Sequence, residues 1–284
     1  MRNNYLQRLT VGCWAVSCLY SPHLLAEPTK LAVPGSAPKK ESAASARPPR
    51  PGWYMGRQIA PTMSASGADW LIRKSRETEE EPRKLMKSLQ LRPKQQVCDF
   101  GCGNGYYTLQ LAQQVGPRGK VFAVDIQQEM LSLLEQRARP RGLKNIEPIL
   151  ATLADPKLPR RQLDLVLMVD VYHELSQPAE ILQAIHASLN ETGRIAIVEF
   201  REEDPEVPIL PLHKMSQAQV MKEIQTNGFK LVGQFDKLPW QHVLFFARED
   251  SSVPAQPLTA WGSAAANLSS REDRQPGPGN ADSP

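Results

Sequence analysis

The sequence is poor in cysteine and aromatic residues, and its apolar runs are short. It has four cysteines in 284 residues, and aromatic residues make up 6% of the chain. Cys98 and Cys102 have three residues between them and no second pair nearby, which is not a zinc-binding cysteine pattern, so we expect free thiols. The apolar run at residues 9–20 is shorter than the roughly 20 residues that a membrane-spanning helix needs. These shortages argue against a disulfide scaffold and a transmembrane helix.

The middle of the chain also lacks an excess of charge of either sign. Residues 53–248 carry 25 basic and 23 acidic side chains, whereas residues 1–52 carry seven basic and two acidic ones. Binding to a phosphate backbone needs a concentrated basic surface. We therefore expect no nucleic-acid partner. No pattern in the sequence indicates an oligomeric state.

The N-terminus has the pattern of a secretory leader. Arg2 and Arg8 precede the apolar run, and a stretch rich in Pro, Ala and Ser follows at 27–52. This order is typical of a signal peptide with a flexible linker behind it. We expect a leader at 1–26, and hence export or attachment to the cell envelope, so that any membrane contact is made by the leader. The alternative is an uncleaved arm on a cytoplasmic protein.

Between the tails, strand and helix patterns alternate, which predicts an α/β fold with a doubly wound, mostly parallel sheet of seven strands. Five residues separate the last two strands, so these form an antiparallel pair. Pro148 places its strand at an edge. The expected strands are 96–100, 120–126, 146–151, 163–170, 194–200, 229–236 and 242–249, and the expected helices are 70–91 with a break near Pro82, 107–115, 128–138, 178–189 and 216–228.

Three segments follow from this pattern. Residues 53–84 form a cap or lid segment, residues 85–249 form the main domain, and residues 250–284 form a disordered tail. A solvated, charged surface is the alternative for the first segment.

The stretch "VCDFGCGNGYYT" places Gly101, Gly103 and Gly105 directly after an apolar strand, with Asp99 at the strand end. Glycines between a strand and a helix let the backbone approach a ligand closely. The spacing is not the G-x-G-x-x-G of dinucleotide folds, because Tyr106 follows Gly105. A carboxylate here suits a ligand with an ammonium group better than a pyrophosphate. An NAD(P) oxidoreductase is therefore disfavoured.

Asp125 ends the next strand, 24 residues after Gly101. An acid at this place can accept both hydroxyls of an adenosine ribose. A helix N-cap is the alternative role.

Together, "CDFGCGNG", "VFAVDI", "LDLVLMVDVYHEL" and "LNETGRIAIVEF" resemble the motifs of class I S-adenosylmethionine-dependent methyltransferases, in the family's order, over residues 85–248. The resemblance implies a Rossmann-like fold, S-adenosyl-L-methionine as cofactor and methyl transfer to a small-molecule acceptor. A non-catalytic cofactor-binding module, serving as a sensor or assembly subunit, is the alternative. The cofactor-binding residues that the family resemblance implies are Asp99, Gly101, Cys102, Gly103, Gly105, Asp125, Ile126, Asp155 and Asp170. The chain departs from the family pattern at 152–154, where an acid is common, and at 191–192, where Pro-Gly is common.

Candidate acceptor-side residues cluster after the fourth strand. His173 and Glu174 are candidate catalytic residues, because a histidine near neutral pH can deprotonate an acceptor; packing against the adenosine is the alternative for His173. The candidate substrate contacts are Tyr54, Arg57, Tyr107 and Glu199. The spacing predicts no metal site, and His173, His213 and His242 could share one only if the fold brought them together.

Overall fold

The computed structural model describes residues 52–262. The predicted leader, nearly all of the predicted linker and the end of the predicted tail lie outside the described residues, so the expectations for them stay predictions. Among residues 52–262, no helix is both long and apolar enough to cross a membrane.

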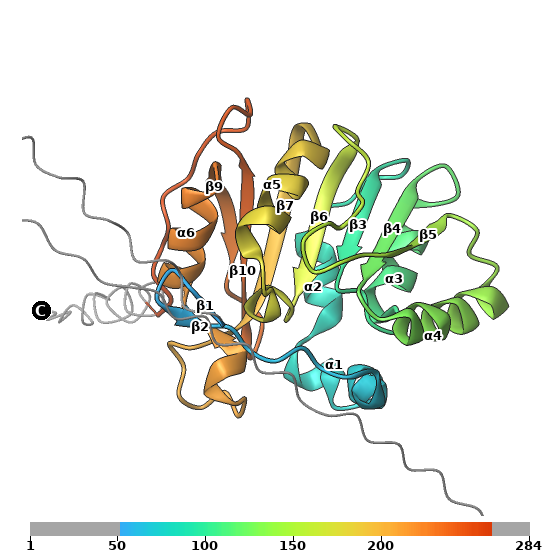
Figure 1. Ribbon diagram of the computed structural model, residues 1–284, viewed down its shortest axis with the longest axis horizontal. Helices are drawn as coiled ribbons and strands as arrows, with labels where there is room; N and C mark the ends of the chain where they lie inside the picture. The colour runs from blue at the N-terminus through green and yellow to red at the C-terminus, as the bar shows by residue number, and fades with distance from the viewer. Residues whose placement is uncertain (1–51, 263–284) are drawn as a thin grey trace, which may run out of the picture. The chain divides into compact units, whose positions relative to one another are not determined.

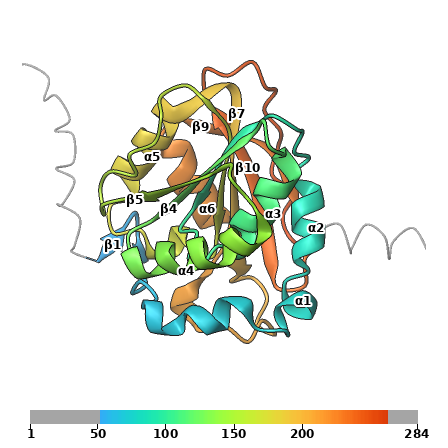
Figure 2. The same ribbon diagram turned by 90° about the vertical axis from the view of Figure 1, so that its right-hand side faces the viewer.

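A twisted sheet forms the centre of the domain, with helices on both faces (Figures 1 and 2). Its main path runs in the order β5-β4-β3-β6-β7-β10-β9. The first five strands are mutually parallel, and β10 pairs antiparallel with both β7 and β9. The strands are β3 (Gln96–Phe100), β4 (Lys120–Asp125), β5 (Ile146–Leu150), β6 (Leu163–Val169), β7 (Leu189–Arg201), β9 (Phe229–Phe235) and β10 (Gln241–Arg248). The predicted fold class is confirmed, and β5 with Pro148 is an edge strand as expected.

The two faces of the sheet carry separate apolar cores, because side chains alternate along each strand. One face holds Cys98, Phe122 and Val166 against α5 (Pro178–Ser188) and α6 (Gln217–Thr226). The other face packs against α2 (Pro82–Ser88), α3 (Tyr106–Val115) and α4 (Gln128–Ala138). The central strand β6 is therefore apolar along almost its whole length, as a strand covered on both faces must be, and β3 is buried from Val97 to Phe100.

The structure also contains short elements that the sequence pattern did not predict. These are β1 (Trp53–Tyr54) and β2 (Arg57–Gln58), which form a hairpin, and β8 (Lys214–Met215), which pairs parallel with β7. Single-turn helices η2 (Arg139–Arg141), η3 (Tyr172–Glu174) and η4 (Pro211–His213) complete the loops. Strands of two residues are too short to show a period, so sequence alone does not reveal them.

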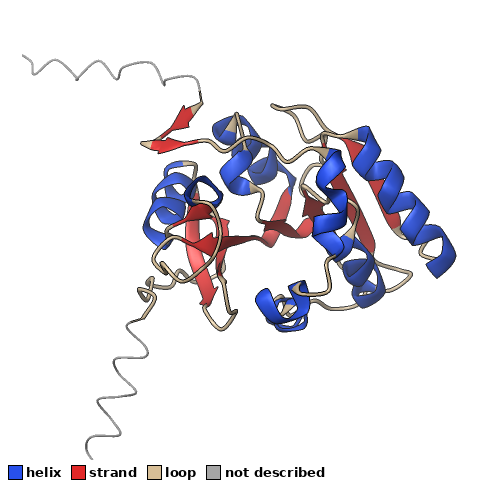
Figure 3. Cartoon of the chain, turned by 90° about the horizontal axis from the view of Figure 1, so that it is seen from below, coloured by secondary structure: helices blue, strands red, loops and turns tan. Residues whose placement is uncertain are grey.

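The predicted helix at 70–91 is instead three short helices. They are η1 (Ala65–Ile72), α1 (Arg76–Glu79) and α2, with the last break at Pro82 as expected. Ser64 caps η1, since its side chain accepts from Ser66 N, and Glu81 before Pro82 takes a left-handed conformation with φ of 45°. These breaks let the segment change direction and pass across the lower end of the sheet (Figures 1 and 2), and Figure 3 shows the domain from this end.

Candidate active site

A cavity of about 550 Å³ opens at the carboxyl ends of the parallel strands. In open α/β sheets this edge is where ligands bind. Residues from β3, β4, β6 and the loops after them form the floor, and the segment between β2 and α1 forms the roof. The lining includes Pro61, Met63, Trp70, Leu71, Arg76, Gly101, Gly103, Asp125, Ile126, Gln127, Leu153, Asp170, His173, Glu174, Leu210 and His213.

The glycine turn reaches this cavity through Gly101 and Gly103, while Gly105 is not among the lining residues. Gly103 has φ of 51°, and a Cβ placed on it would lie 2.6 Å from Leu71 Cδ1 of the roof. Gly105 has φ of 82°, and a Cβ there would collide with Leu134 of α4. The turn therefore needs glycine both for its left-handed backbone and for the side chains packed on it.

Asp125 stands at the end of β4, beside this turn, and lines the cavity. Its carboxylate accepts hydrogen bonds from Gly103 N and Gln127 N, each at 2.9 Å. Burial raises its pKa, and the backbone N–H groups oppose that shift. Each carboxylate oxygen keeps a second lone pair for a ligand hydroxyl.

Asp99 and Cys102 lie behind the turn and are not among the residues that line the cavity. The Asp99 carboxylate accepts from Thr108 Oγ1 at 2.5 Å, and burial raises its pKa to about 6. Burial also raises the pKa of the Cys102 thiol, and both Cys98 and Cys102 are free thiols, as expected.

Asp170 follows β6, lines the cavity and has one carboxylate oxygen without a partner among the described residues. Its Oδ2 accepts from Gln241 Nε2 at 2.7 Å, whereas the buried Oδ1 has no hydrogen-bond partner among the described residues. The residue adopts φ of 52°, a strained backbone for a side chain other than glycine. Burial, with the nearby carboxylates of Glu80 and Glu199, raises its pKa well above the ordinary value. A ligand with a cationic donor would satisfy this oxygen.

His173 lies at the far end of the cavity and is held by Glu199. Its Nδ1 is 2.6 Å from Glu199 Oε2, and its backbone N–H donates to Glu199 Oε1 at 3.3 Å. Burial lowers the pKa of His173, but the attraction of Glu199 and Glu174 outweighs it, so the pKa is raised. Because Nδ1 must carry the proton that faces the carboxylate, the neutral ring leaves a lone pair on Nε2.

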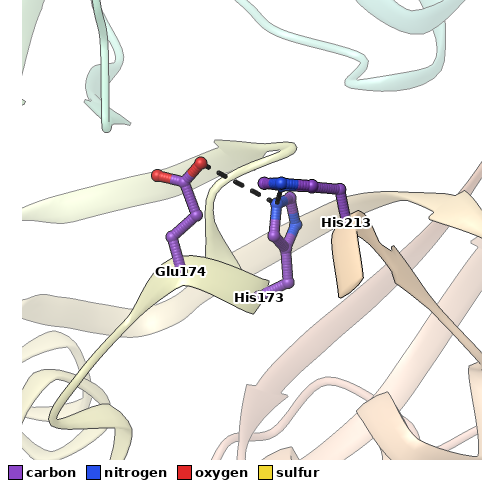
Figure 4. A group of neighbouring side chains, drawn as sticks. All are labelled: His173, Glu174 and His213. Carbon is purple, nitrogen blue, oxygen red and sulfur yellow. Dashed lines mark hydrogen bonds and ion pairs between the residues drawn. The ribbon is translucent and has the colours of Figure 1, made fainter. Parts of the chain in front are cut away.

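Glu174 and His213 surround that nitrogen (Figure 4). His213 Nδ1 is 3.0 Å from His173 Nε2, and Glu174 Oε1 is 3.9 Å from the same nitrogen. Burial raises the pKa of Glu174 to about 7. The pKa of His213 is lowered by burial and by His173. The three groups share one polar pocket in the cavity wall.

The roof is tied to the floor by polar contacts. Asn104 Nδ2 donates to Ala68 O at 2.7 Å, and Gln127 bonds both Met63 O and Ala65 N at 2.9 and 2.8 Å. Residues of the predicted cap or lid segment thus contact the loops after β3 and β4. Met63 and Gln127 are site residues that the sequence reasoning missed, because their contacts join residues more than 60 positions apart.

Several predicted site residues lie outside the cavity lining. Arg57 bonds Glu223 and the His173 carbonyl, and the Tyr54 hydroxyl accepts from Asn227 Nδ2. Tyr107 is buried on α3, and Asp155 is exposed in its loop, where its carboxylate accepts from Lys157 N.

Glu199 reaches the cavity through His173 and is not itself among the lining residues. Of the three histidines considered together, the fold joins His173 and His213 to Glu174, and His242 is not part of this group. His242 is instead fully buried in β10, and burial lowers its pKa to about 3.

Comparisons with known proteins agree with this architecture. Residues 91–248, more than half of the chain, match the family described as "Methyltransferase domain". Demethylmenaquinone methyltransferase of Geobacillus stearothermophilus is 28% identical over 102 residues, which cover 36% of this chain and 44% of that protein. Nocamycin O-methyltransferase of Saccharothrix syringae is 34% identical over 84 residues, 30% of each chain. The chain thus spans less than half the length of these two relatives.

A solved structure, that of a SAM-dependent methyltransferase from Aquifex aeolicus, superimposes with a TM-score of 0.61 at 25% identity. The match covers 65% of this chain and 98% of that one.

The cavity fits the cofactor of these proteins. Asp125 offers acceptors for ribose hydroxyls, and the unpartnered Oδ1 of Asp170 can receive an ammonium group. Gly103 leaves the backbone of the turn open to the cavity between them. By motif order, strand order and sequence match, this chain belongs to the methyltransferase-domain family, with the fold of a class I methyltransferase and S-adenosylmethionine as its cofactor.

Proposed function

We propose that this chain transfers the methyl group of S-adenosylmethionine to a small acceptor with an apolar body and one polar nucleophile. The observation that carries the proposal is the division of a single cavity into two ends. Gly101, Gly103 and Asp125 lie at the ends of β3 and β4, while His173 and His213 lie beyond β6. The strand order β4-β3-β6-β7 separates the two sets along the sheet edge.

The acceptor end combines an apolar rim with a polar base. Leu210, whose carbonyl accepts from His213 N at 2.9 Å, is 71% exposed and lines the cavity at this end, and Trp70 of the roof, 42% exposed, also lines the cavity. Large exposed apolar side chains around a cavity favour a ligand with apolar surface. The polar group at the acceptor end of the cavity is His173, which Glu199 holds from behind. The names of the relatives, which refer to demethylmenaquinone and nocamycin, support a small-molecule acceptor.

The cofactor supplies a methyl group already activated by its sulfonium sulfur. The chain's task is then to align the acceptor, to exclude water and to manage one proton. When the acceptor attacks, its bond to the methyl carbon forms as the carbon–sulfur bond breaks, and the sulfur keeps the electron pair. In this proposal His173 Nε2, which lies 3.0 Å from His213 Nδ1, takes the acceptor's proton, and Glu199 holds the ring in position.

Binding and turnover test the proposal separately. Titration of the purified chain with cofactor measures binding, and incubation with cell extract and methyl-deuterated cofactor reveals a product by its mass shift. Binding with a labelled product supports the enzyme. Binding without any product favours the non-catalytic module, and absence of binding at about 1 mM cofactor overturns both.

Asp125→Ala tests the cofactor end. The variant removes the acceptor for two ribose hydroxyls and should weaken cofactor binding by about 1–3 kcal/mol. Glu135→Ala, at an exposed position on α4, is the matched control and should bind as the native chain does. Equal affinity in both folded variants would remove Asp125 from the cofactor site.

A further inference from the structure

We propose that His173, Glu174 and His213 bind a divalent transition-metal ion of the zinc class at the acceptor end of the cavity. These residues offer two imidazole nitrogens and a carboxylate oxygen, and the three atoms lie within 4.8 Å of one another. The sequence spacing of the three does not form a local metal motif, since His213 follows His173 by 40 residues. It is the pairing of β8 with β7 that fixes the His213 segment beside the end of β6.

The distances approach those of ligands around one ion. His173 Nε2 is 3.0 Å from His213 Nδ1 and 3.9 Å from Glu174 Oε1. Two ligands at about 2.05 Å from a tetrahedral ion are about 3.4 Å apart. Small side-chain rotations therefore convert the present hydrogen-bonded arrangement into a coordination shell, and Figure 4 shows Glu174 and His213 both directed toward His173 Nε2.

The contacts behind His173 fit a metal ligand. Histidine ligands commonly donate their second N–H to a carboxylate, which fixes the tautomer and the direction of the lone pair. The fully buried Glu199 has this position, with its Oε2 2.6 Å from His173 Nδ1. Glu199 lies near the carboxyl end of β7, opposite His242 of β10. The Nε2 lone pair is thereby aimed at the pocket that it shares with Glu174 and His213.

The charges also favour a cation. Glu174 and Glu199 flank the buried ring of His173, and among the described residues neither carboxylate makes a salt bridge to a lysine or arginine. The guanidinium of Arg57, on this side of the molecule, donates to the His173 carbonyl and pairs with Glu223 instead. A divalent ion would neutralise the two carboxylates in a site that excludes much of the solvent.

Three protein ligands leave at least one coordination position open. All three residues line the cavity, so the open position faces the space left for the acceptor. This ligand set is the one that catalytic zinc sites use, and an oxygen or sulfur bound to the ion loses its proton more readily. The inference rests on the proposed function and changes its proton step, because the Nε2 lone pair of His173 is then a metal ligand and no longer the base. The acceptor class is a hydroxyl or thiol compound that binds the ion, releases its proton to solvent, and forms its bond to the methyl carbon as the carbon–sulfur bond breaks.

Metal binding is tested with the full chain and with the metal alone. The chain is stripped with a chelator and titrated with Zn²⁺ by calorimetry and with Co²⁺ by visible absorption, which reports the coordination geometry. His213→Ala and Glu174→Gln each remove one ligand and should weaken binding by about tenfold or more, and Glu199→Gln should do so by about tenfold through the orientation of His173. His186→Gln, on α5 outside the cavity lining, is the matched control and should leave binding unchanged.

The outcomes separate this proposal from the proposed function. Cofactor affinity is measured on the same stripped proteins, and it should be equal in the native chain and in His213→Ala. A native chain that binds cofactor and fails to bind Zn²⁺ or Co²⁺ at about 100 μM overturns the metal site and leaves the function intact. Metal binding that is equal in His213→Ala and the native chain places the ion elsewhere and also overturns it. Metal binding without cofactor binding would instead contradict the proposed function.

Discussion

At the scale of single residues, the glycines of the turn after β3 look alike in sequence but have different neighbours. An added Cβ would meet Val171 at Gly101, Leu71 at Gly103 and Leu134 at Gly105. Gly103 thus makes room for the roof of the cavity, whereas Gly105 makes room for α4. The pattern "CDFGCGNG" indicates a ligand, but one of its glycines serves the packing of two helices.

Gly105→Ala should therefore destabilise the fold more than a comparable glycine substitution. Gly142 is the matched control, because it has the same left-handed backbone, with φ of 65° and ψ of 20° against 82° and 27° at Gly105, yet its added Cβ would meet nothing within 4 Å. Gly142→Ala should cost about 1 kcal/mol from backbone strain alone. Gly105→Ala adds the clash with Leu134 and should cost about 1–3 kcal/mol more. Urea denaturation of both variants measures the difference, and equal losses would mean that α4 shifts freely.

Asp99 should make the stability of the cofactor-free protein depend on pH. Its pKa is raised from 3.8 to about 6 by burial, so the folded state resists ionisation of this group. Below pH 3.8 Asp99 is protonated in both the folded and the unfolded chain, and the free energy of unfolding is highest. It falls as the pH rises from 3.8 to about 6, and Asp99 causes no further change above that pH. Two pKa units correspond to about 3 kcal/mol, an upper bound for the effect.

Asp99→Asn removes the charge and keeps an oxygen for Thr108 Oγ1. The free energy of unfolding of the variant should rise relative to the native chain between about pH 4 and 6, by about 1–3 kcal/mol in total. Urea denaturation at a series of pH values gives this difference. A difference that stays flat across the range would show that the folded protein ionises Asp99 without a penalty.

At the scale of elements, the hairpin β1–β2 is fixed to α6 by a buried ion pair. Arg57 Nε is 2.8 Å from Glu223 Oε1, and the Glu223 side chain is fully buried. Tyr172 and Gln219 also donate to Glu223, at 2.9 and 2.7 Å. The hairpin, α6 and the turn that carries His173 therefore depend on one carboxylate.

Arg57→Met should destabilise the protein by about 3 kcal/mol, because it leaves the Glu223 charge buried without its partner. The double variant Arg57→Met/Glu223→Gln should recover part of this loss, since the amide needs no counter-charge. Arg83→Met removes the exposed pair with Glu77 and is the control, with an expected change below about 1 kcal/mol. Denaturation of the three variants tests this order, and a double variant as unstable as Arg57→Met would contradict it.

The long elements could be predicted from sequence, whereas the short ones could not. Central strands such as Leu163–Val169 are apolar throughout, and Ser216 and Gly228 mark the ends of α6. The hairpin, β8 and the three pieces of 65–88 depend on tertiary contacts, because one or two turns do not show a period. The same limit applied to the site: Asp125 and the glycines carry a local motif, but the contact of His213 with His173 depends on β8.

At the scale of the whole molecule, the segment before α2 closes the cavity from outside the motif-bearing part of the chain. Pro61, Met63, Trp70 and Leu71 line the cavity, and the family match begins only at residue 91. The roof is joined to the floor by a few hydrogen bonds, such as Asn104 Nδ2 to Ala68 O, rather than by an extensive apolar core. Segments of this kind open at a lower free energy than the sheet does.

Cofactor binding should therefore protect the roof from proteolysis. Lys74 is exposed between η1 and α1, and trypsin cuts after it when the roof opens. A ligand that bridges floor and roof stabilises the closed form, and at about 100 times its dissociation constant it should slow this cut by up to about 100-fold. Arg160, exposed in the loop before β6 and outside the cavity lining, is the control site and should be cut at an unchanged rate. Fragments are assigned by mass spectrometry. Equal cutting after Lys74 with and without bound cofactor would show that the roof does not take part in holding it.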